Sequence, residues 1–320
     1  MYRIVYNEFM TSSNDRVIEI AGLYKSYGRL EAIRGIDFHV NRAEVFALLG
    51  PNGSGKTTTV EILEGHRNRD DGMVDVLGHD PAHPGPTFRE RIGIVLQSTG
   101  VEPYLTVEET ICQFRGFYPH PRPLEEVLEV VGLTDHRATR VRRLSGGQQR
   151  RLDVAVSLAG DPDLLFLDEP TTGFDPAARR LAWELVRNLR TLGKTIFLTT
   201  HYMEEAEQLA DRLAILVEGK IVAVGTAGEL MSRDHLSTIQ FRQGLSTAVL
   251  IKDVTDEITL TDGVFSIHTT RPTETLAKIT NQATQLGLEL EGLTVTGATL
   301  EDIYLRLTDT EANKTRKGNG

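Results

Sequence analysis

The sequence predicts an α/β fold built on a parallel sheet, followed by a smaller α+β domain. From Val17 to about Gly225, short apolar runs alternate with helical patterns, which is typical of a parallel α/β sheet. Several of these runs are continuously apolar, as expected for strands that are buried on both faces. After about Ser232 the order changes, because strand-like runs come first and helical patterns follow.

Length and composition limit the class of protein. The 320 residues are enough for two or three domains, and 40% hydrophobic with 25% charged residues is an ordinary composition for a soluble globular protein. No apolar run approaches the ~18 residues of a membrane span, and the N-terminus does not resemble a signal peptide. The formal net charge of −10 argues against a nucleic-acid binder. We expect residues 1–15 and 309–320 to be flexible tails.

Four apolar runs in the first part each deliver a polar feature at their C-terminal end. "EVFALLG" leads into a glycine-rich turn, and "RIGIVLQ" ends at Gln97. "DLLFLDE" ends at Asp168 and Glu169, and "TIFLTTH" ends at His201. In open α/β sheets, ligands bind outside the carboxyl ends of the strands. We therefore expect these four sites to converge on one crevice.

The glycine-rich turn matches the P-loop pattern G-x-x-x-x-G-K-[ST]. Its residues are Gly50, Pro51, Asn52, Gly53, Ser54, Gly55, Lys56 and Thr57, and a helical pattern that includes Thr58 follows. Glycines let the backbone direct its N–H groups at phosphate oxygens, and the helix N-terminus adds its dipole. Lys56 places a charge on the β/γ-phosphates, and Thr57 offers its hydroxyl to Mg²⁺.

Asp168 and Glu169 at the end of a buried strand suit two different tasks. A P-loop nucleotide site needs a carboxylate ligand for Mg²⁺, and Asp168 is the candidate. Adjacent residues of a strand face opposite ways, so Glu169 is the candidate base that polarises the attacking water. Two carboxylates in a solvated turn are the alternative, which the nearby P-loop pattern disfavours.

The segment at about 100–160 predicts a helical insertion. "LTVEETICQFRGFY" begins with a capping box formed by Thr106 and Glu109, and "PLEEVLEVVGL" ends at Gly132. Arginines are concentrated in 137–151, either on a solvated helical face, which we favour, or as a rim for phosphate or lipid head groups. Cys112, the single cysteine, excludes an internal disulfide, suits a reducing cytoplasm and is expected to be a small buried side chain.

The rest of the chain predicts a hairpin and then the appended domain. "LAILVEGKIVAVGT" predicts two strands around a Glu-Gly turn. "STIQFRQ", "TAVLIK" and "VFSIHTT" are strand-like, and "TETLAKITNQATQLG" is helical. A last helix, "LEDIYLRL", follows Thr299, which can form a capping box with Asp302.

These motifs together resemble the nucleotide-binding subunit of an ATP-binding-cassette (ABC) transporter. "LSGGQ", Leu144, Ser145, Gly146, Gly147 and Gln148, is identical to that family's signature motif, and "LLFLDEP" is similar to its Walker B strand and catalytic glutamate. The resemblance covers 17 to about 230 and implies a P-loop NTPase cassette with a parallel sheet core, an antiparallel β part and a helical insertion. It implies a Q-loop glutamine at Gln97, a switch histidine at His201, an adenine-stacking aromatic at Tyr27 and a D-loop aspartate at Asp175.

The resemblance also implies cofactors and partners. ATP and Mg²⁺ bind together, with Thr57, Gln97 and Asp168 as the metal ligands. Two copies pair head to tail as a homodimer, and the signature motif of one copy closes over the ATP held by the other. The chain is peripheral, on the cytoplasmic face of the membrane, with a polytopic permease as its partner and no nucleic acid. Phe174 stands where the family usually has leucine, and Ser98 where glutamate is frequent.

A second resemblance concerns residues 232–308. "TLEDIYLRLT" resembles the C-terminal extension of the drug-resistance branch of ABC-2 exporter ATPases, the daunorubicin-exporter type. That branch implies export of hydrophobic or amphiphilic compounds such as drugs and antibiotics. Its extension is thought to stabilise or regulate the ATPase dimer, while the alternative is a domain that only packs, and the residues do not decide between them.

Two other functions are compatible with parts of the sequence. A soluble ABC-type ATPase acting on nucleic acid or ribosomes would carry a long coiled coil, a zinc module or a second cassette, and the sequence shows none of these. A regulator that binds ATP without hydrolysing it would not need Glu169 and His201, which are both present. The sequence therefore favours the ATPase subunit of an exporter.

Overall fold

The computed structural model describes residues 15–95, 100–232, 237–242, 250–251, 256–297 and 299–306. Gln97 and Ser98 lie outside the described residues, as does most of the two terminal segments predicted to be flexible. The chain forms two compact units that divide between Thr226 and Ala227.

A six-stranded sheet forms the centre of the first unit, in the strand order β5-β6-β7-β3-β8-β9. Its first five strands are parallel, and β9 pairs antiparallel with β8. The strands are β3 (Val45–Leu49), β5 (Ile92–Val95), β6 (Leu164–Asp168), β7 (Thr195–Thr200), β8 (Arg212–Val217) and β9 (Lys220–Gly225). All residues of β3 and β7 are buried, which confirms the prediction of strands covered on both faces. β8 and β9 are joined by Glu218 and Gly219, both with positive φ, as in the predicted hairpin turn.

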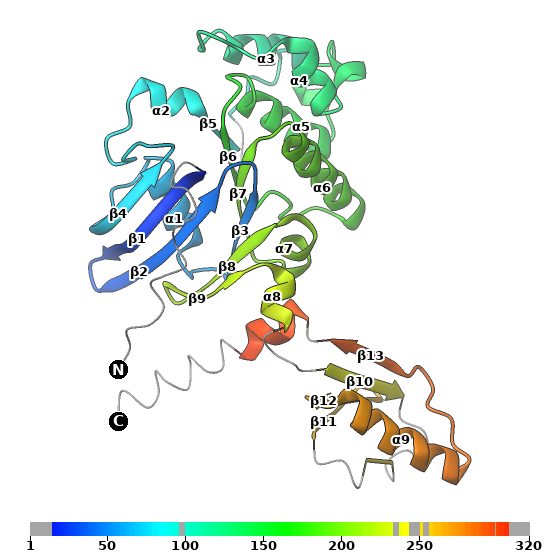
Figure 1. Cartoon of the computed structure of the whole chain (residues 1–320). Helices are drawn as coiled ribbons and strands as arrows, with labels where there is room; N and C mark the ends of the chain where they lie inside the picture. Colours follow the sequence, from blue (N-terminus) through cyan, green and yellow to red (C-terminus); the bar gives the residue numbers. More distant parts are fainter. Residues whose placement is uncertain are drawn as a thin grey trace. The chain divides into compact units, whose positions relative to one another are not determined.

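A second, antiparallel sheet has the order β2-β1-β4 and packs against the first through a shared core (Figure 1). Its strands are β1 (Arg16–Tyr27), β2 (Leu30–Asn41) and β4 (Asp71–Val76). Helix α1 (Lys56–Leu63) contributes Ile62 and Leu63 to that core. Phe38 of β2 stacks on Phe46 of β3 with 5.2 Å between ring centroids. The two sheets therefore hold α1, and with it the start of the glycine-rich turn, at a fixed place.

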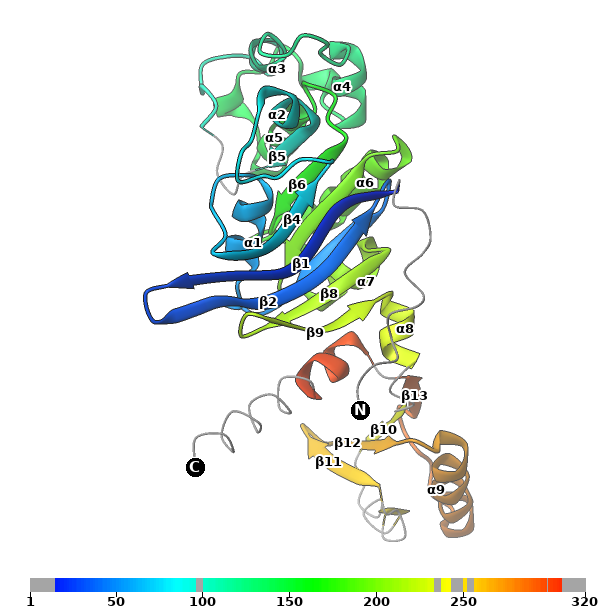
Figure 2. The same cartoon turned by 60° about the vertical axis from the view of Figure 1, so that its left-hand side comes forward.

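Between β5 and β6 the described chain is helical (Figure 2). Its helices are α3 (Val107–Arg115), α4 (Leu124–Val130), the short turns 134–136 and 141–143, and α5 (Gly146–Ser157). The predicted capping box at the start of α3 is confirmed, and Gly132 follows α4 with a φ of 64°. Cys112 is exposed on α3, so the prediction of a buried thiol is wrong, because its position faces away from buried Ile111 and Val107.

Three more helices complete the first unit. Helix α2 (Pro86–Arg91) precedes β5, α6 (Pro176–Thr191) follows β6, and α7 (Met203–Leu209) follows β7. In Figure 1, α6 and α7 lie on the side of the parallel sheet opposite to β1, β2 and β4. Trp183 of α6 is buried, whereas Phe114 of α3 is only half-buried and pairs edge-on with Phe117.

The second unit is an antiparallel sheet with one long helix. After α8 (Ala227–Ser232) the sheet has the order β11-β12-β10-β13. Its elements are β10 (Ser237–Arg242), β11 (Glu257–Thr261), β12 (Val264–Thr269), α9 (Pro272–Leu286) and β13 (Thr294–Gly297). Phe241, Phe265 and Ile279 belong to its own hydrophobic core. A last helix at 300–306 is capped by Thr299 and Asp302, as predicted.

One strand predicted for this unit is not a strand at the two residues of it that the structure describes. "TAVLIK" spans 247–252, of which only Leu250 and Ile251 are described, and both lie in a helical turn. Leu250 is fully buried in the unit's core. A short apolar run fits a buried turn as well as a buried strand, so its pattern alone could not distinguish them.

Glu64, directly after α1, is a buried carboxyl group inside the first unit. The residue is 7% exposed, and burial raises the pKa of its carboxyl group from an ordinary 4.5 to about 8, helped by the negative charges of Asp168 and Glu61. The native state therefore binds a proton at Glu64 more tightly than the unfolded state does. The stability that this proton provides is complete below about pH 4.5 and is lost as the pH rises through 8.

We predict that Glu64→Gln removes this loss. The quantity compared is the free energy of unfolding of the variant minus that of the wild type, without nucleotide or magnesium. We expect this difference to be larger at about pH 8 than at about pH 5, by on the order of 2–4 kcal/mol. Urea denaturation at the two pH values measures it, with the exposed Glu129→Gln as the control. A Glu64→Gln protein whose stability follows the wild type at both pH values would show that Glu64 is ionised throughout.

Candidate functional site

The glycine-rich turn between β3 and α1 is closely fitted to the backbone around it. Gly53 and Gly55 have positive φ, and a Cβ on Gly55 would lie 2.6 Å from the carbonyl oxygen of Ala32. A Cβ on Gly50 would lie 2.3 Å from the carbonyl oxygen of Leu216. Ser54 is buried, and its hydroxyl has no hydrogen-bond partner among the described residues. The turn thus has the shape and the donors of a phosphate-binding loop.

Lys56 is buried inside this turn. Its ammonium donates to the carbonyl oxygens of Gly50, at 2.8 Å, and of Pro51, at 3.1 Å. Its Nζ also lies 3.3 Å from Oε1 of Glu169, at the end of β6. A carboxylate oxygen therefore occupies the neighbourhood of Lys56, where a phosphate oxygen would provide the same negative charge.

Glu169 is held in an uncommon backbone conformation. Its φ is 46°, in the left-handed region that costs a non-glycine residue about 1 kcal/mol or more. Its backbone N–H donates to the carbonyl and the hydroxyl of Thr199 on β7, at 3.2 and 3.0 Å. Thr172 donates its hydroxyl to Oε2 of Glu169 at 3.1 Å. These bonds direct the carboxylate toward the glycine-rich turn rather than along the strand.

His201, at the end of β7, completes a cluster of three. Its Nδ1 lies 3.3 Å from Oε1 of Glu169, the oxygen that also faces Lys56. Burial alone would raise the pKa of Glu169, but the charge of Lys56 and the hydroxyl of Thr172 outweigh it. The pKa of Glu169 therefore lies below its usual value, and the carboxylate is ionised at neutral pH.

Asp168, next to Glu169, points another way. Its Oδ1 accepts a hydrogen bond from the hydroxyl of Thr199, and its carbonyl oxygen faces Arg150 of α5. Thr199 thus binds both neighbouring acidic residues, through its side chain to Asp168 and through its backbone and hydroxyl to the N–H of Glu169.

A cavity of about 610 Å³ lies along the glycine-rich turn. Its lining includes Tyr27 and Glu169, and from the turn and α1 it includes Asn52, Gly53, Gly55, Lys56, Thr57 and Thr58. The ring of Tyr27 is 39% exposed, and the guanidinium of Arg67 lies 5.2 Å from its centre. The cavity therefore joins an aromatic ring at one place to a phosphate-type loop at another.

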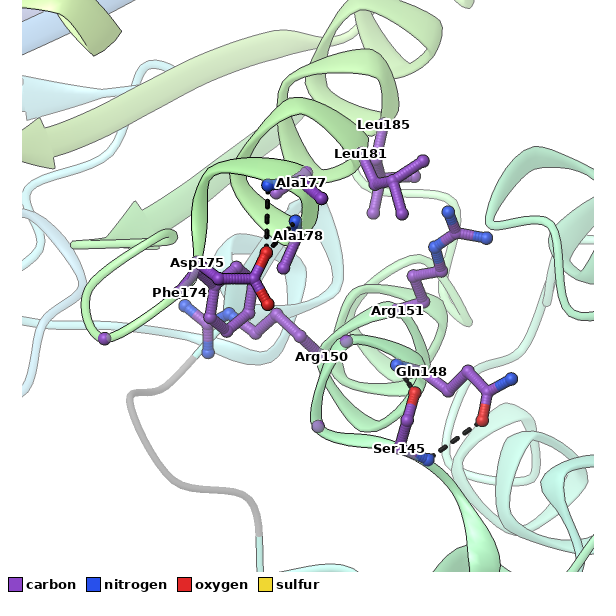
Figure 3. Close-up of a pocket in the computed structure, with 14 residues that line it drawn as sticks. Ser145, Gln148, Arg150, Arg151, Phe174, Asp175, Ala177, Ala178, Leu181 and Leu185 are labelled. Carbon is purple, nitrogen blue, oxygen red and sulfur yellow. Dashed lines mark hydrogen bonds between the residues drawn. The ribbon is translucent and has the colours of Figure 1, made fainter.

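The signature turn comprises residues 144–148, and 145–148 of it line a different cavity of about 680 Å³ (Figure 3). Ser145 caps α5: its hydroxyl accepts from the N–H of Gln148, and the Gln148 side chain accepts from the N–H of Ser145. Across the cavity, Asp175 caps α6 by accepting from the N–H groups of Ala177 and Ala178. Leu144, before the cap, is buried.

The structure thus brings some predicted site residues together and separates others. Lys56, Glu169 and His201 form one cluster, whereas Ser145 and Asp175 belong to the second cavity. The two cavities have no lining residue in common. Sequence reasoning missed Thr199 and Thr172, because a threonine beside an acidic residue is common and only its hydrogen bonds distinguish it.

Known proteins resemble this chain over most of its length. A family model described as "ABC transporter" matches residues 33–172. A daunorubicin resistance ATP-binding protein of Streptomyces coeruleorubidus is 37% identical over 304 residues, which cover 92% of this chain and 96% of that protein. A Nod factor export ATP-binding protein of Sinorhizobium fredii is 38% identical over 315 residues, which cover 95% and 90%.

Solved structures agree with these sequence relatives. The cbiO1 protein of Clostridium perfringens, part of an ABC transporter complex, aligns with a TM-score of 0.61 and 27% identity, over 68% of this chain and 91% of that one. A dimeric ATP-binding cassette in a post-hydrolysis state aligns with a TM-score of 0.57 and 24% identity, over 65% and 98%. Within the described residues, no helix combines the length and the apolar character needed to span a bilayer.

The P-loop, the acidic pair after β6 and the signature turn are in place on this fold, and the relatives span nearly the whole chain. The chain therefore belongs to the ABC transporter family, as one of its ATP-binding proteins, and is an ATPase.

Proposed function

We propose that this chain is the ATP-hydrolysing subunit that powers an exporter. In this proposal ATP binds along the glycine-rich turn, with its adenine ring stacked on Tyr27. The cluster of Lys56, Glu169 and His201 is the observation that carries the proposal. Residues 17–230 form the ATPase domain in this proposal, and residues 232–308 form an accessory domain. The names of the relatives, which refer to drug resistance and to Nod factor export, support export as the process.

The arrangement suggests how hydrolysis proceeds. Lys56 and the N–H groups of the glycine-rich turn bind the β/γ-phosphates, and the ionised Glu169 takes a proton from the attacking water. In this proposal His201 contacts both the Glu169 carboxylate and the terminal phosphate and keeps their relative position fixed. Thr57, Asp168 and Gln97 are the proposed ligands of Mg²⁺, which would neutralise charge that develops on the phosphates. Thr57 and Asp168 fit this task, because a hydroxyl and a carboxylate are ligands that Mg²⁺ prefers.

We predict that Glu169→Gln lowers the rate of ATP hydrolysis by about 10²–10³-fold and leaves ATP binding within a few-fold of wild type. The amide keeps the size of the carboxylate but cannot accept the proton. Phosphate release measures turnover, and titration with a fluorescent ATP analogue measures binding. Glu184→Gln, an exposed residue of α6, is the matched control. Undiminished turnover in Glu169→Gln would show that the base lies elsewhere.

We further propose that the signature turn serves the ATP of a second copy in a head-to-tail homodimer. The two cavities share no lining residue in the part of the chain that the structure describes, and residues 145–148 of the signature turn line only the second one. Gly146 and Gly147 have no positive φ, and a Cβ on either would meet nothing within 4 Å. Among the described residues of the chain, nothing therefore requires glycine there, whereas close approach by a partner's phosphate would.

We predict that Gly147→Ala stabilises the isolated chain and weakens its ATPase activity. Alanine favours a helix over glycine by up to about 1 kcal/mol, and here its methyl group has room. Urea denaturation measures the gain, and phosphate release measures a loss of turnover of about tenfold or more. A variant that is stabilised and fully active would argue against a partner at this turn.

A mixing experiment separates action in trans from action in cis. Lys56→Ala and Gly147→Ala chains are each impaired alone. In a mixed head-to-tail dimer, the intact P-loop of one chain meets the intact signature turn of the other, so mixing restores turnover. No recovery on mixing would show that each chain uses its own signature turn.

For the membrane partner we propose a polytopic permease that docks at Tyr104 and Leu105, with the ATPase on the cytoplasmic face. Tyr104 is 61% exposed, and the guanidinium of Arg142 lies 5.0 Å from its ring centre. Arg140 and Arg143 are exposed nearby in sequence. An apolar helix with acidic flanks matches this surface, and the substrate we propose for its passage is hydrophobic or amphiphilic and drug-like.

We predict that Tyr104→Ala with Leu105→Ala reduces recovery of the chain with membranes by about tenfold, with ATPase activity in solution retained. Sedimentation with vesicles that contain the permease measures recovery. Phe117→Ala, an exposed aromatic of the same helical segment, is the control. Equal membrane recovery and transport in the double variant would exclude this docking site.

A further inference from the structure

Glu205 is a buried carboxylate that the proposed mechanism does not use. It lies on α7, four residues after His201, and its side chain is 1% exposed. Its Oε1 accepts hydrogen bonds from the hydroxyl of Thr171, at 2.8 Å, and from the indole N–H of Trp183, at 3.2 Å. Burial raises the pKa of Glu205 above its usual value.

These two hydrogen bonds join three segments that each carry a site residue. Thr171 lies two residues after Glu169, in the turn that the N–H of Thr172 closes on the carbonyl of Glu169 at 3.2 Å. Trp183 lies on α6, the helix that Asp175 caps. Glu205 itself lies on the helix that follows His201. One carboxylate oxygen thus connects the segments of Glu169, Asp175 and His201.

Packing alone does not account for a carboxylate at this place. Removing an acidic side chain from water costs several kcal/mol, and an apolar side chain of similar shape would pack without that cost. A carboxylate oxygen can bind two donors from different segments at defined angles, which an apolar side chain cannot. The hydrogen bonds fix where Thr171 and Trp183 lie relative to α7.

We propose that Glu205 is a positioning residue for ATP hydrolysis, which ties the turn after Glu169 to α6 and α7 and so sets the 3.3 Å separation of Glu169 and His201. The inference rests on the proposed function, because it matters only if Glu169 acts as the base. Glu205 is not among the described residues that line the cavity along the glycine-rich turn or the cavity at the signature turn. Its loss therefore changes the rate of the chemical step rather than the affinity for ATP.

Three variants of the full chain test this role. Thr171→Val removes one hydroxyl donor at nearly constant volume. Glu205→Leu removes every hydrogen bond of the carboxylate, including the one with Thr200, and Glu205→Gln keeps an acceptor oxygen. We expect kcat to fall by about tenfold or more in Thr171→Val and Glu205→Leu, with KM for ATP within a factor of about two. Glu205→Gln retains an intermediate kcat. Glu204→Gln, the adjacent residue with a side chain 68% exposed, is the control.

Trp183, the chain's only tryptophan, provides a spectroscopic check at the same site. Because its indole N–H binds Glu205, its emission shifts in Glu205→Leu and is retained in Glu204→Gln. A variant with emission like the urea-unfolded chain has lost its fold, and Thr171→Val then carries the test, because Glu205 and Trp183 stay in place.

The outcomes separate this inference from the proposed function. Wild-type kcat in folded Thr171→Val and Glu205→Leu, with Glu169→Gln inactive, would overturn the role of Glu205 and leave the ATPase mechanism standing. A parallel loss of kcat and ATP affinity would also overturn it, in favour of a purely structural role. Full activity of Glu169→Gln would instead show that Glu169 is not the catalytic base, and both the proposed function and the role of Glu205 depend on that base.

Discussion

The buried ammonium of Lys56 is the constraint on which the arrangement of the site depends. A buried charge without partners costs several kcal/mol, so the chain must surround it with acceptors. Two carbonyl oxygens of the glycine-rich turn and the carboxylate of Glu169 do so. The turn can curl this tightly only with glycines, and Glu169 can reach Lys56 only because β6, β7 and β3 end at one edge of the sheet. The local backbone and the sheet topology therefore both supply acceptors for the buried ammonium of Lys56.

Neutral hydroxyl groups orient three acidic side chains in and next to this site. Thr199 binds Asp168, Thr172 binds Glu169, and Thr171 binds Glu205. A lysine or arginine in these places would fix the same oxygens but would compete with the positive groups that a nucleotide site needs. The hydroxyls fix orientation, while the negative charge stays available to a proton or a metal ion.

Periodicity and motif spacing predicted the parallel strands, the P-loop and the helix caps, because each depends on residues close together in sequence. The capping boxes at Thr106 and Thr299 need only four residues each. The contacts that depend on distant residues were not predicted: Thr171 meets Glu205 across 34 positions, and Glu64 takes its raised pKa from burial and from Asp168. Strands β11 and β13 were missed because threonine and glycine weaken their apolar pattern.

The signature turn is ordered by hydrogen bonds within a single chain. The reciprocal hydrogen bonds of Ser145 and Gln148 fix the turn within the single chain. The first N–H groups of a helix have no acceptor within it, and here the Ser145 hydroxyl accepts from that of Gln148. A preformed turn loses little conformational entropy on binding, so little of the free energy of contact is offset by the cost of ordering the turn. The open space beside both glycines leaves the backbone accessible to the phosphate of the second copy that we propose, and larger side chains at these positions would obstruct it.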